Sequence, residues 1–317
     1  MFTPYRRNRA AIALFALVAL AAGACGDDSP TTAGQPSAST AAPDPDRVLR
    51  ISAIPDQDPA KLASINATMA AYLSTELGRK VEFVPVTDYA ASVSLFRTGD
   101  LDMVFFGGLT GVQARLQTPG ATLLAQRDID DAFQTVFIAN TATGVKPVTE
   151  VKGLTALKDR RFTFGSESST SGRLMPEYFL DQAGMSSGRD FSGPPGYSGS
   201  HDKTVDLVTS GTYEAGALNL QVWKTRLAAG TIDQARVTEV FTTPPYHDYH
   251  WMAGPKTDER FGAGFTDRIK AALLALDVND AEQAKLLTLY GARRFIATEA
   301  ANYVQIEEIG RKLKLVT

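Results

Sequence analysis

Residues Arg161-Phe-Thr-Phe-Gly-Ser-Glu-Ser-Ser-Thr-Ser-Gly-Arg173 decide how the surrounding chain is organised. Phe162–Phe164 predict the end of a buried strand, and residues 174–183 predict a helix that ends at Gly184. A strand that breaks into hydroxyl residues and glycine just before a helix offers backbone N–H groups that have no helical partner. These donors and the partial positive charge of the helix end predict a site for a small anion. The same residues would also cap a helix that binds no ligand, so the stretch alone leaves both interpretations open.

The composition excludes several classes of protein. The chain has 317 residues, enough for two units with cores of their own, and a formal net charge of -3. No basic stripe runs along it, so we expect no nucleic acid partner. The single cysteine rules out a disulfide framework and a thiolate metal cluster within the chain. The hydroxyl-rich stretch contains Glu167 and lacks lysine, which excludes a Walker-type phosphate loop.

The first 25 residues have the pattern of an export signal. Arginines at positions 6, 7 and 9 precede an apolar run over residues 10–22, which is short for a membrane span. Small residues then lead to Cys25 as in a bacterial lipobox, although Ala22 stands where leucine is typical. Residues 1–25 therefore predict a lipoprotein signal peptide with Cys25 as the lipidated residue, the alternatives being an ordinary signal peptide or a membrane anchor. Residues 26–47 lack aromatic and bulky apolar side chains and predict a disordered tether.

The remainder of the chain predicts two α/β lobes joined by a hinge. Alternating strand and helix patterns fill the first part, with strands expected at residues 48–54, 80–85, 101–106 and 135–139 and helices at 60–77 and 89–97. The first three strands and their helices predict an open parallel sheet, and a second α/β unit is expected after a crossing segment at residues 144–148. The predicted boundaries are residues 48–140 and 246–317 for lobe 1 and residues 141–245 for lobe 2. Two exported, tethered lobes and a loop that is expected to bind an anion predict a solute-binding protein that closes around its ligand.

Residues 48–317 resemble the phosphonate- and phosphite-type solute-binding proteins that feed ABC importers. The resemblance is carried by Asp88-Tyr-Ala90, by Gly99-Asp-Leu-Asp102 before a buried strand, and by Phe164-Gly with Ser169-Thr-Ser-Gly172 and Pro176. Within the family, Ile54-Pro-Asp-Gln-Asp-Pro59 is most similar to a subgroup described as selenate binders. The resemblance implies an α/β, two-lobed, periplasmic-binding-protein-like (type II) fold with a ligand cleft between the lobes.

The same resemblance implies a set of ligand contacts. Hydrogen bonds to ligand oxygens would come from Ser169, Thr170 and Ser171 in the second lobe and from Tyr89 in the first. The further implied contacts are a pocket wall from Phe133, an amide from Gln134, a histidine near the anion at His201, and an acceptor at Asp248. Gln221 falls where phosphonate binders carry a glutamate that can hold a ligand amine, a departure that bears on the identity of the ligand. Each of these residues could instead have only a structural role.

The acidic residue of this set separates two kinds of oxyanion. An ionised Asp248 is a hydrogen-bond acceptor only. It suits an anion that keeps a proton near neutral pH, such as phosphonate, phosphite, phosphate or arsenate. Selenate and sulfate keep no proton near neutral pH, so the lone pairs of their oxygens would repel those of the Asp248 carboxylate. The protonation argument favours a phosphorus-type oxyanion and the subgroup resemblance favours selenate, so both remain open.

Other classes of protein compete with an anion receptor. A zinc receptor is an alternative, because His201, His247, His250 and Asp248 could meet near one cleft. A receptor of the thiamin-precursor or nitrate/sulfonate type is another. Ser200-His-Asp-Lys203 matches the S-x-x-K pattern of penicillin-interacting enzymes, but no K-T-G or S-D-N follows it. Gly-x-Ser-x-Gly is absent around residues 166–171, which argues against a hydrolase.

We therefore expect a binding protein and not an enzyme. It would be lipid-anchored at the outer face of the bacterial cytoplasmic membrane and would act as a monomer without cofactor or metal. Its expected partners are a small oxyanion and the permease and ATPase subunits of an ABC importer.

Overall fold

The computed structural model describes Asp44 and residues 46–316. The predicted signal peptide, Cys25 and most of the predicted tether lie outside the described residues. Within residues 44 and 46–316, no helix combines the length and the apolar character that crossing a membrane requires.

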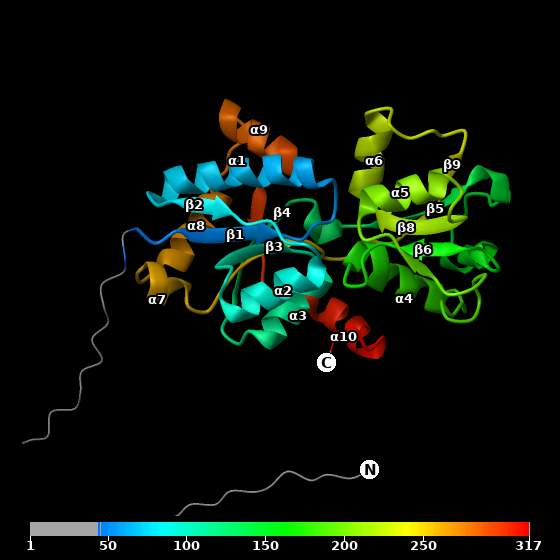
Figure 1. Ribbon diagram of the computed structural model, residues 1–317, viewed down its shortest axis with the longest axis horizontal. Helices are drawn as coiled ribbons and strands as arrows, with labels where there is room; N and C mark the ends of the chain where they lie inside the picture. The colour runs from blue at the N-terminus through cyan, green and yellow to red at the C-terminus, as the bar shows by residue number, and fades with distance from the viewer. Residues whose placement is uncertain (1–43, 45, 317) are drawn as a thin grey trace, which may run out of the picture. The chain divides into compact units, whose positions relative to one another are not determined.

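Lobe 1 is built on a six-stranded sheet with the strand order β11-β4-β10-β3-β1-β2. Its first segment contains β1 (Leu49–Ala53), α1 (Pro59–Leu77), β2 (Val81–Phe83), α2 (Tyr89–Thr98), β3 (Met103–Phe106), α3 (Gly108–Gln117), β4 (Thr122–Arg127) and η1 (Asp130–Ala132). The chain returns to it as β10 (His250–Ala253), α7 (Thr257–Phe261), α8 (Phe265–Leu274), α9 (Ala281–Tyr290), β11 (Phe295–Ala297), η5 (Ala300–Tyr303) and α10 (Val304–Lys312). Helices α1 and α9 lie on one side of this sheet and α2 and α3 on the other (Figure 1).

The sheet of lobe 1 is parallel among its first three strands and antiparallel at the strands with which the chain returns. Strand β1 pairs in parallel with β2 and β3, as expected. Strand β10 enters from the opposite direction, between β3 and β4, and is antiparallel to both. The parallel pairing predicted for the first three strands is therefore confirmed, and β10 is antiparallel because it comes back from the second lobe and runs against the strands that lead to it.

Two capped helix starts bring polar groups to the edge of lobe 1 that faces lobe 2. The Asp58 carboxylate accepts a hydrogen bond from the Lys61 N–H at the start of α1. Asp88 caps α2 in the same way by accepting from the Ala91 N–H. This second cap fixes Tyr89 as the first residue of α2, where its side chain is buried.

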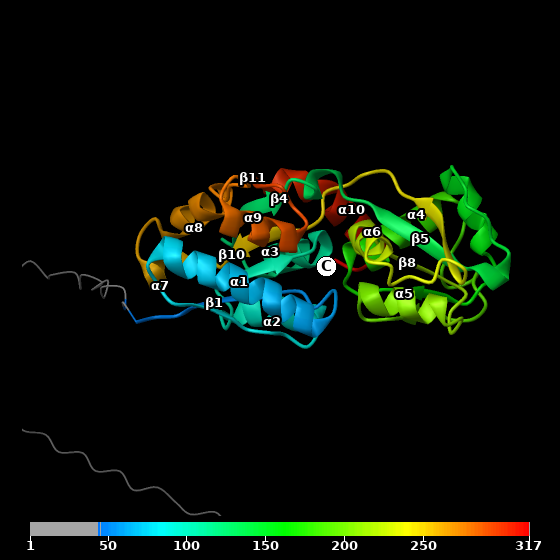
Figure 2. The ribbon, with the colours of Figure 1, turned by 90° about the horizontal axis from the view of Figure 1, so that it is seen from above.

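Lobe 2 is built on a five-stranded sheet with the strand order β7-β6-β8-β5-β9. Its elements are β5 (Thr135–Asn140), η2 (Thr141–Thr143), η3 (Val151–Leu157), β6 (Phe162–Phe164), η4 (Thr170–Leu174), α4 (Met175–Gln182), β7 (Gly196–Tyr197), α5 (His201–Thr209), β8 (Ala215–Asn219), α6 (Leu220–Ala228) and β9 (Val237–Thr242). Helices α5 and α6 lie on one side of the sheet and α4 on the other (Figure 1). Seen from above, α5 and α6 lie side by side (Figure 2).

The hinge lies earlier in the chain than predicted. Strand β5 is antiparallel to β8 and β9, so residues 135–140 belong to lobe 2, and the predicted lobe 1 segment 48–140 is wrong at this end. The proposed crossing segment 144–148 is wrong as well, because the Val148 N–H donates to the Val240 carbonyl within lobe 2. The two strands of the hinge instead meet where Phe133 and Tyr246 exchange backbone hydrogen bonds of 2.8 and 2.9 Å.

The C-terminal helix contacts both lobes. Helix α10 packs against α3 of lobe 1 and against η4 of lobe 2. An ion pair joins Lys312 Nζ of α10 to Asp181 Oδ2 of α4 at 2.7 Å. Segment η4 contains most of the hydroxyl-rich turn, residues 169–172, so α10 helps to place this turn beside lobe 1.

Candidate functional site

The hydroxyl-rich turn between β6 and α4 is held by its own backbone. Ser169 Oγ accepts a hydrogen bond of 3.0 Å from the Gly172 N–H, and the Gly165 N–H donates to the Gly172 carbonyl at 2.7 Å. A Cβ on Gly172 would lie 2.9 Å from Ser169 Oγ and 3.1 Å from Gly165 Cα, so only glycine fits there. Thr170 and Ser171 are buried within this turn, at the start of a helical segment. The predicted strand, hydroxyl turn and helix are confirmed.

The start of α3 in lobe 1 meets this turn directly. The Leu109 N–H donates to Thr170 Oγ1 at 3.0 Å, a bond that crosses from one lobe to the other. The preceding N–H, that of Gly108, donates to Asp248 Oδ1 at 2.8 Å. A helix start from lobe 1, a hydroxyl turn from lobe 2 and a carboxyl group from the hinge therefore converge, because each supplies or accepts a helix-end hydrogen bond.

Buried polar atoms without a partner gather around this junction. Among the residues that the structure describes, Tyr89 Oη, Ser171 Oγ and Asp248 Oδ2 are buried and make no hydrogen bond. Burial raises the pKa of the Tyr89 hydroxyl well above its usual value, and the negative charges of Asp56 and, to a smaller extent, Asp248 raise it further. Because buried polar groups in folded proteins almost always have a hydrogen-bond partner, these two hydroxyls and one carboxyl oxygen mark a place for a polar ligand.

The Asp248 carboxyl group is poised between its two protonation states. Burial raises the pKa of Asp248 to about 7, although hydrogen bonds from Gly108 and Thr170 lower it. Near neutral pH its free oxygen can therefore accept a proton from a ligand hydroxyl or donate one to a ligand oxygen.

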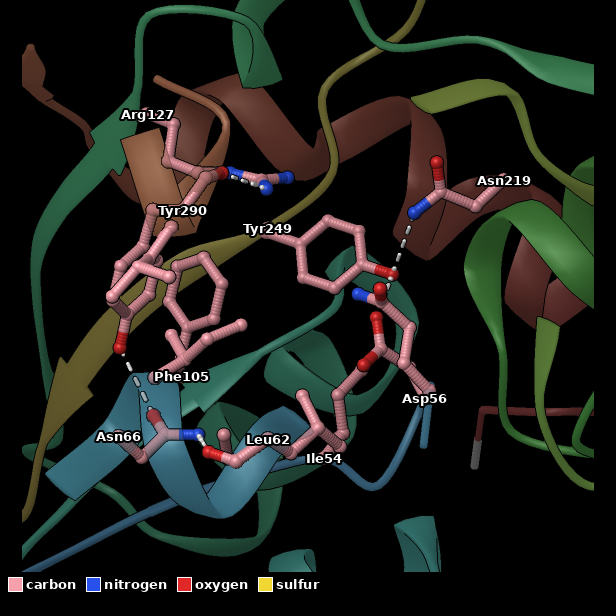
Figure 3. A pocket seen from close by; sticks show the side chains of 13 residues that line it. Ile54, Asp56, Leu62, Asn66, Phe105, Arg127, Asn219, Tyr249 and Tyr290 are labelled. Atoms are coloured by element: carbon pink, nitrogen blue, oxygen red, sulfur yellow. Dashed lines mark hydrogen bonds between the residues drawn. The ribbon is translucent and has the colours of Figure 1, made fainter. Parts of the chain in front are cut away.

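A second polar network lies beside this junction and also joins the lobes. Tyr249 Oη donates to Asp56 Oδ2 at 2.7 Å and accepts from Asn219 Nδ2 at 3.3 Å (Figure 3). The same oxygen lies 3.4 Å from His201 Nε2. Burial lowers the pKa of His201 to about 4, so the ring is neutral at pH 7 and brings no positive charge. The Asn219 N–H donates to Nδ1 of this ring at 3.4 Å, which leaves Nε2 to carry the proton.

A small cavity of about 40 Å³ adjoins this network. Figure 3 shows its walls, which include the aromatic rings of Phe105, Tyr249 and Tyr290 and the polar side chains of Asp56 and Arg127. The Arg127 guanidinium lies 4.8 Å from the centre of the Tyr249 ring. Asn219 brings a side chain from lobe 2 to the lining of the cavity.

Three residues of the predicted site contact other parts of the protein. The Phe133 ring packs against Tyr246 and Tyr249 in the hinge. Gln134 Nε2 donates to the Thr243 carbonyl at 2.6 Å. Gln221 Oε1 accepts from Arg127 Nη1 at 2.9 Å, so its amide reaches lobe 1.

The predicted residues thus fall into separate groups. Tyr89, Ser169, Thr170, Ser171 and Asp248 converge at the junction, whereas the ring of His201 belongs to the neighbouring network. The zinc alternative finds no support, because the described part of the chain contains no group of His, Cys, Asp or Glu that could hold a metal ion. His250 instead directs Nδ1 at the Asp248 carbonyl, at 3.2 Å, and its ring packs against Tyr303.

Sequence reasoning missed the contribution of Gly107 and Gly108. A Cβ on Gly107 would lie 3.3 Å from Thr170 Oγ1 and 3.4 Å from Asp248 Oδ1, closer than most such contacts. The signal was available, because two glycines directly follow a buried strand and precede a helix, as in other anion sites. Asp56, Asn219 and Tyr249 were also missed: Asp56 lies in the stretch of residues 54–59 but was not assigned a contact, and no local pattern pointed to Asn219 or Tyr249.

Two sheets joined by paired hinge strands, with a buried polar site where the lobes meet, define a two-lobed solute-binding protein. Comparison with known proteins gives its family. The family model of the periplasmic substrate-binding proteins of phosphonate ABC transporters matches residues 51–303. This chain belongs to that family, and the family and fold class expected from the sequence are confirmed.

The relatives include proteins named for two phosphorus oxyanions. The probable ABC transporter phosphite binding protein PhnD1 of Prochlorococcus marinus is 48% identical over 271 residues, 85% of this chain and 91% of that protein. The phosphate-import protein PhnD of Mycolicibacterium smegmatis is 28% identical over 237 residues, 71% of this chain and 70% of that protein.

Solved structures agree with this assignment. The structure of the Prochlorococcus marinus PhnD1 in complex with methylphosphonate superposes with a TM-score of 0.83 at 47% identity and covers 86% of this chain and 100% of that chain. The aliphatic sulphonate binding protein SsuA of Escherichia coli, with a TM-score of 0.55 at 16% identity over 85% of this chain and 88% of that one, shares the fold alone. The chain is thus an extracytoplasmic substrate-binding component of an ABC importer.

Proposed function

We propose that this protein captures a small phosphorus oxyanion, with phosphite and methylphosphonate as the first candidates, and delivers it unaltered to its permease and ATPase. The proposal rests on the junction of the two lobes. Tyr89 Oη, Ser171 Oγ and Asp248 Oδ2 are buried there without partners among the described residues. Two hydroxyl donors from opposite lobes and one carboxyl oxygen complement an anion that has several oxygens and one proton.

The size of the junction favours a small ligand. Tyr89, Ser169, Thr170, Ser171 and Asp248 are each no more than 3% exposed, and the lobes touch across them. The relatives named for phosphite and crystallised with methylphosphonate support an anion of this size. A ligand with a long organic substituent would hold the lobes apart and break the hydrogen bond from the Leu109 N–H to Thr170.

The protonation state of the ligand separates this proposal from selenate binding. Phosphorus oxyanions exchange a proton near neutral pH, as Asp248 does. One proton can then be shared between the ligand and the Asp248 carboxyl group in a single hydrogen bond. Selenate brings no proton, so at pH 8 its oxygen would face an ionised carboxylate.

A panel of anions measured by isothermal titration calorimetry tests the proposal. We expect phosphite, methylphosphonate and phosphate to bind more tightly than selenate and sulfate at pH 7.5. Equal or tighter binding of selenate would reject the phosphorus assignment. Binding heat on titration with zinc, with none from the anions, would restore the hypothesis of a metal receptor.

Replacing Thr170 with alanine tests the site itself. The Thr170 hydroxyl accepts a hydrogen bond from the Leu109 N–H of the other lobe, and its hydrogen bond to Asp248 favours the ionised carboxylate. Thr170→Ala should therefore weaken phosphite binding at least tenfold, or about 1.4 kcal/mol. Thr225→Ala, on an exposed position of α6 in the same lobe, is the matched control. An unchanged dissociation constant for Thr170→Ala, measured by the same titration, would remove this residue from the site.

We further propose that Cys25 carries a lipid that holds the monomeric protein at the outer face of the cytoplasmic membrane. The lipobox-like pattern before Cys25 supports this. In cell fractionation, Cys25→Ser should move the protein from the membrane fraction to the soluble extracytoplasmic fraction while phosphite binding is kept. Retention of the variant at the membrane would instead favour an uncleaved membrane anchor.

A further inference from the structure

Gln221, at the start of α6 in lobe 2, inserts its amide into lobe 1. Its Oε1 accepts a hydrogen bond of 2.9 Å from Arg127 Nη1. Its Nε2 donates to the carbonyls of Tyr290 and Gly291, each at 3.4 Å. The side chain thus uses both ends of its amide on atoms of the other lobe.

The end of α9 is shaped to receive this amide. Gly291 caps α9 in the left-handed conformation with a φ of 65° and ψ of 30°. A Cβ at this position would collide with Gln221 Nε2, so glycine is needed for the backbone and for the inserted side chain. Free carbonyls and the negative end of the helix dipole favour an N–H donor at such a terminus.

Arg127 connects this contact to the junction of the lobes. Its guanidinium also donates to the Tyr290 carbonyl at 2.9 Å and to Asp130 through Nη2 at 2.6 Å. The Asp130 carbonyl in turn accepts the Asp248 N–H at 3.0 Å. The position of Gln221 is therefore tied to the hinge residue that supplies the free carboxyl oxygen.

We infer that Gln221 is a latch that holds the lobes closed after the anion has entered, and that it acts as a positioning residue without touching the ligand. Its partners Arg127, Tyr290 and Gly291 all belong to lobe 1, so these hydrogen bonds exist only while the lobes are together. The inference rests on the proposed function, since a latch matters only for a protein that closes on a ligand. It gives Gln221 a role different from the ligand contact that the resemblance implied.

Release kinetics of the Gln221→Ala variant test the latch. Stopped-flow fluorescence with phosphite and with methylphosphonate should show dissociation about tenfold faster than in the unchanged protein, with little change in the association rate. The factor should be the same for both anions, because a latch that does not touch the ligand does not sense its substituent. A factor that differs severalfold between the two anions would make Gln221 a ligand contact and overturn the latch.

Two glycine substitutions in lobe 1, which leave Gln221 and the rest of lobe 2 unaltered, provide a matched pair. Gly291→Ala should displace the Gln221 amide and speed release as Gln221→Ala does, and the double variant should be no faster than either single one. Gly78→Ala is the control, because Gly78 caps α1 with φ 58° and ψ 34° and a Cβ there meets nothing within 4 Å. Both alanines strain the backbone alike, so only Gly291→Ala should change the dissociation rate.

The outcomes separate the latch from the proposed function. If the unchanged protein gives no signal with phosphite, methylphosphonate or phosphate, the proposed function fails. If it binds and Gln221→Ala or Gly291→Ala releases the anion at the unchanged rate, the latch is rejected while the function stands.

Discussion

Replacing Asp248 with asparagine is expected to change which oxyanions the protein prefers. The asparagine can still accept the Gly108 N–H through its amide oxygen, while its NH2 group takes the place of the free Oδ2. It then donates to the ligand at every pH and cannot accept a ligand proton. Selenate and sulfate should gain on phosphite by roughly a hundredfold in relative affinity, or about 2.7 kcal/mol, when titrated at pH 8.

The Asp248→Asn substitution should also change the pH dependence of binding. Above pH 7 both Asp248 and the ligand lose their protons, so the unchanged protein must take up a proton to bind, and affinity should fall towards tenfold per pH unit. Asp248→Asn should largely remove this fall. A profile that declines equally in both proteins between pH 7 and 9 would contradict the shared proton.

The same substitution should stabilise the protein without ligand at alkaline pH. Burial raises the pKa of Asp248 to about 7 from its usual 3.8. Between these two values the folded state binds more protons than the unfolded state, so the free energy of unfolding falls as the pH rises. Asparagine does not ionise, so the variant should be more stable at pH 8 by roughly 1–4 kcal/mol and nearly unchanged at pH 4 in thermal denaturation.

Local patterns in the sequence were enough to find the part of the candidate site that is contiguous. The turn from Ser169 to Gly172 follows a buried strand and precedes a helix, and both signals lie within a few residues of it. Tyr89 is found in the same way, because Asp88 marks the first turn of α2. Hydrogen-bonding chemistry of this kind is encoded by neighbours in the chain, so inspection of the sequence can detect it.

The remaining features depend on pairings between distant segments. Arg127 and Gln221 meet across 94 positions, and Asp56 meets Tyr249 across 193. Strand β5 reads as a buried strand, but only its pairing with β8 and β9 assigns it to lobe 2. Burial and β-branched residues predict that a segment is a strand without indicating its partner, which is why the hinge was placed too late.

Replacing Arg127 with methionine is expected to cause the largest loss of stability. The Arg127 and Asp130 side chains are only 7% and 0% exposed, and Nη2 lies 2.6 Å from Oδ1. Burial raises the pKa of Asp56, and the hydrogen bond from Tyr249 and the Arg127 charge oppose this rise. Without the guanidinium, two buried carboxyl groups lose their counter-charge, a change that typically costs about 3–5 kcal/mol.

Calorimetric unfolding should show this loss as a drop in the midpoint temperature of about 10 °C. Arg115→Met is the matched control, because Arg115 and its partner Glu307 are 26% and 23% exposed and their pair should contribute less than about 1 kcal/mol. Combining Arg127→Met with Asp130→Asn should recover part of the loss, since the amide needs no counter-charge. Equal midpoints for Arg127→Met and Arg115→Met would show that the buried pair does not organise the hinge, and the link from the latch through Arg127 to Asp248 would lose its basis.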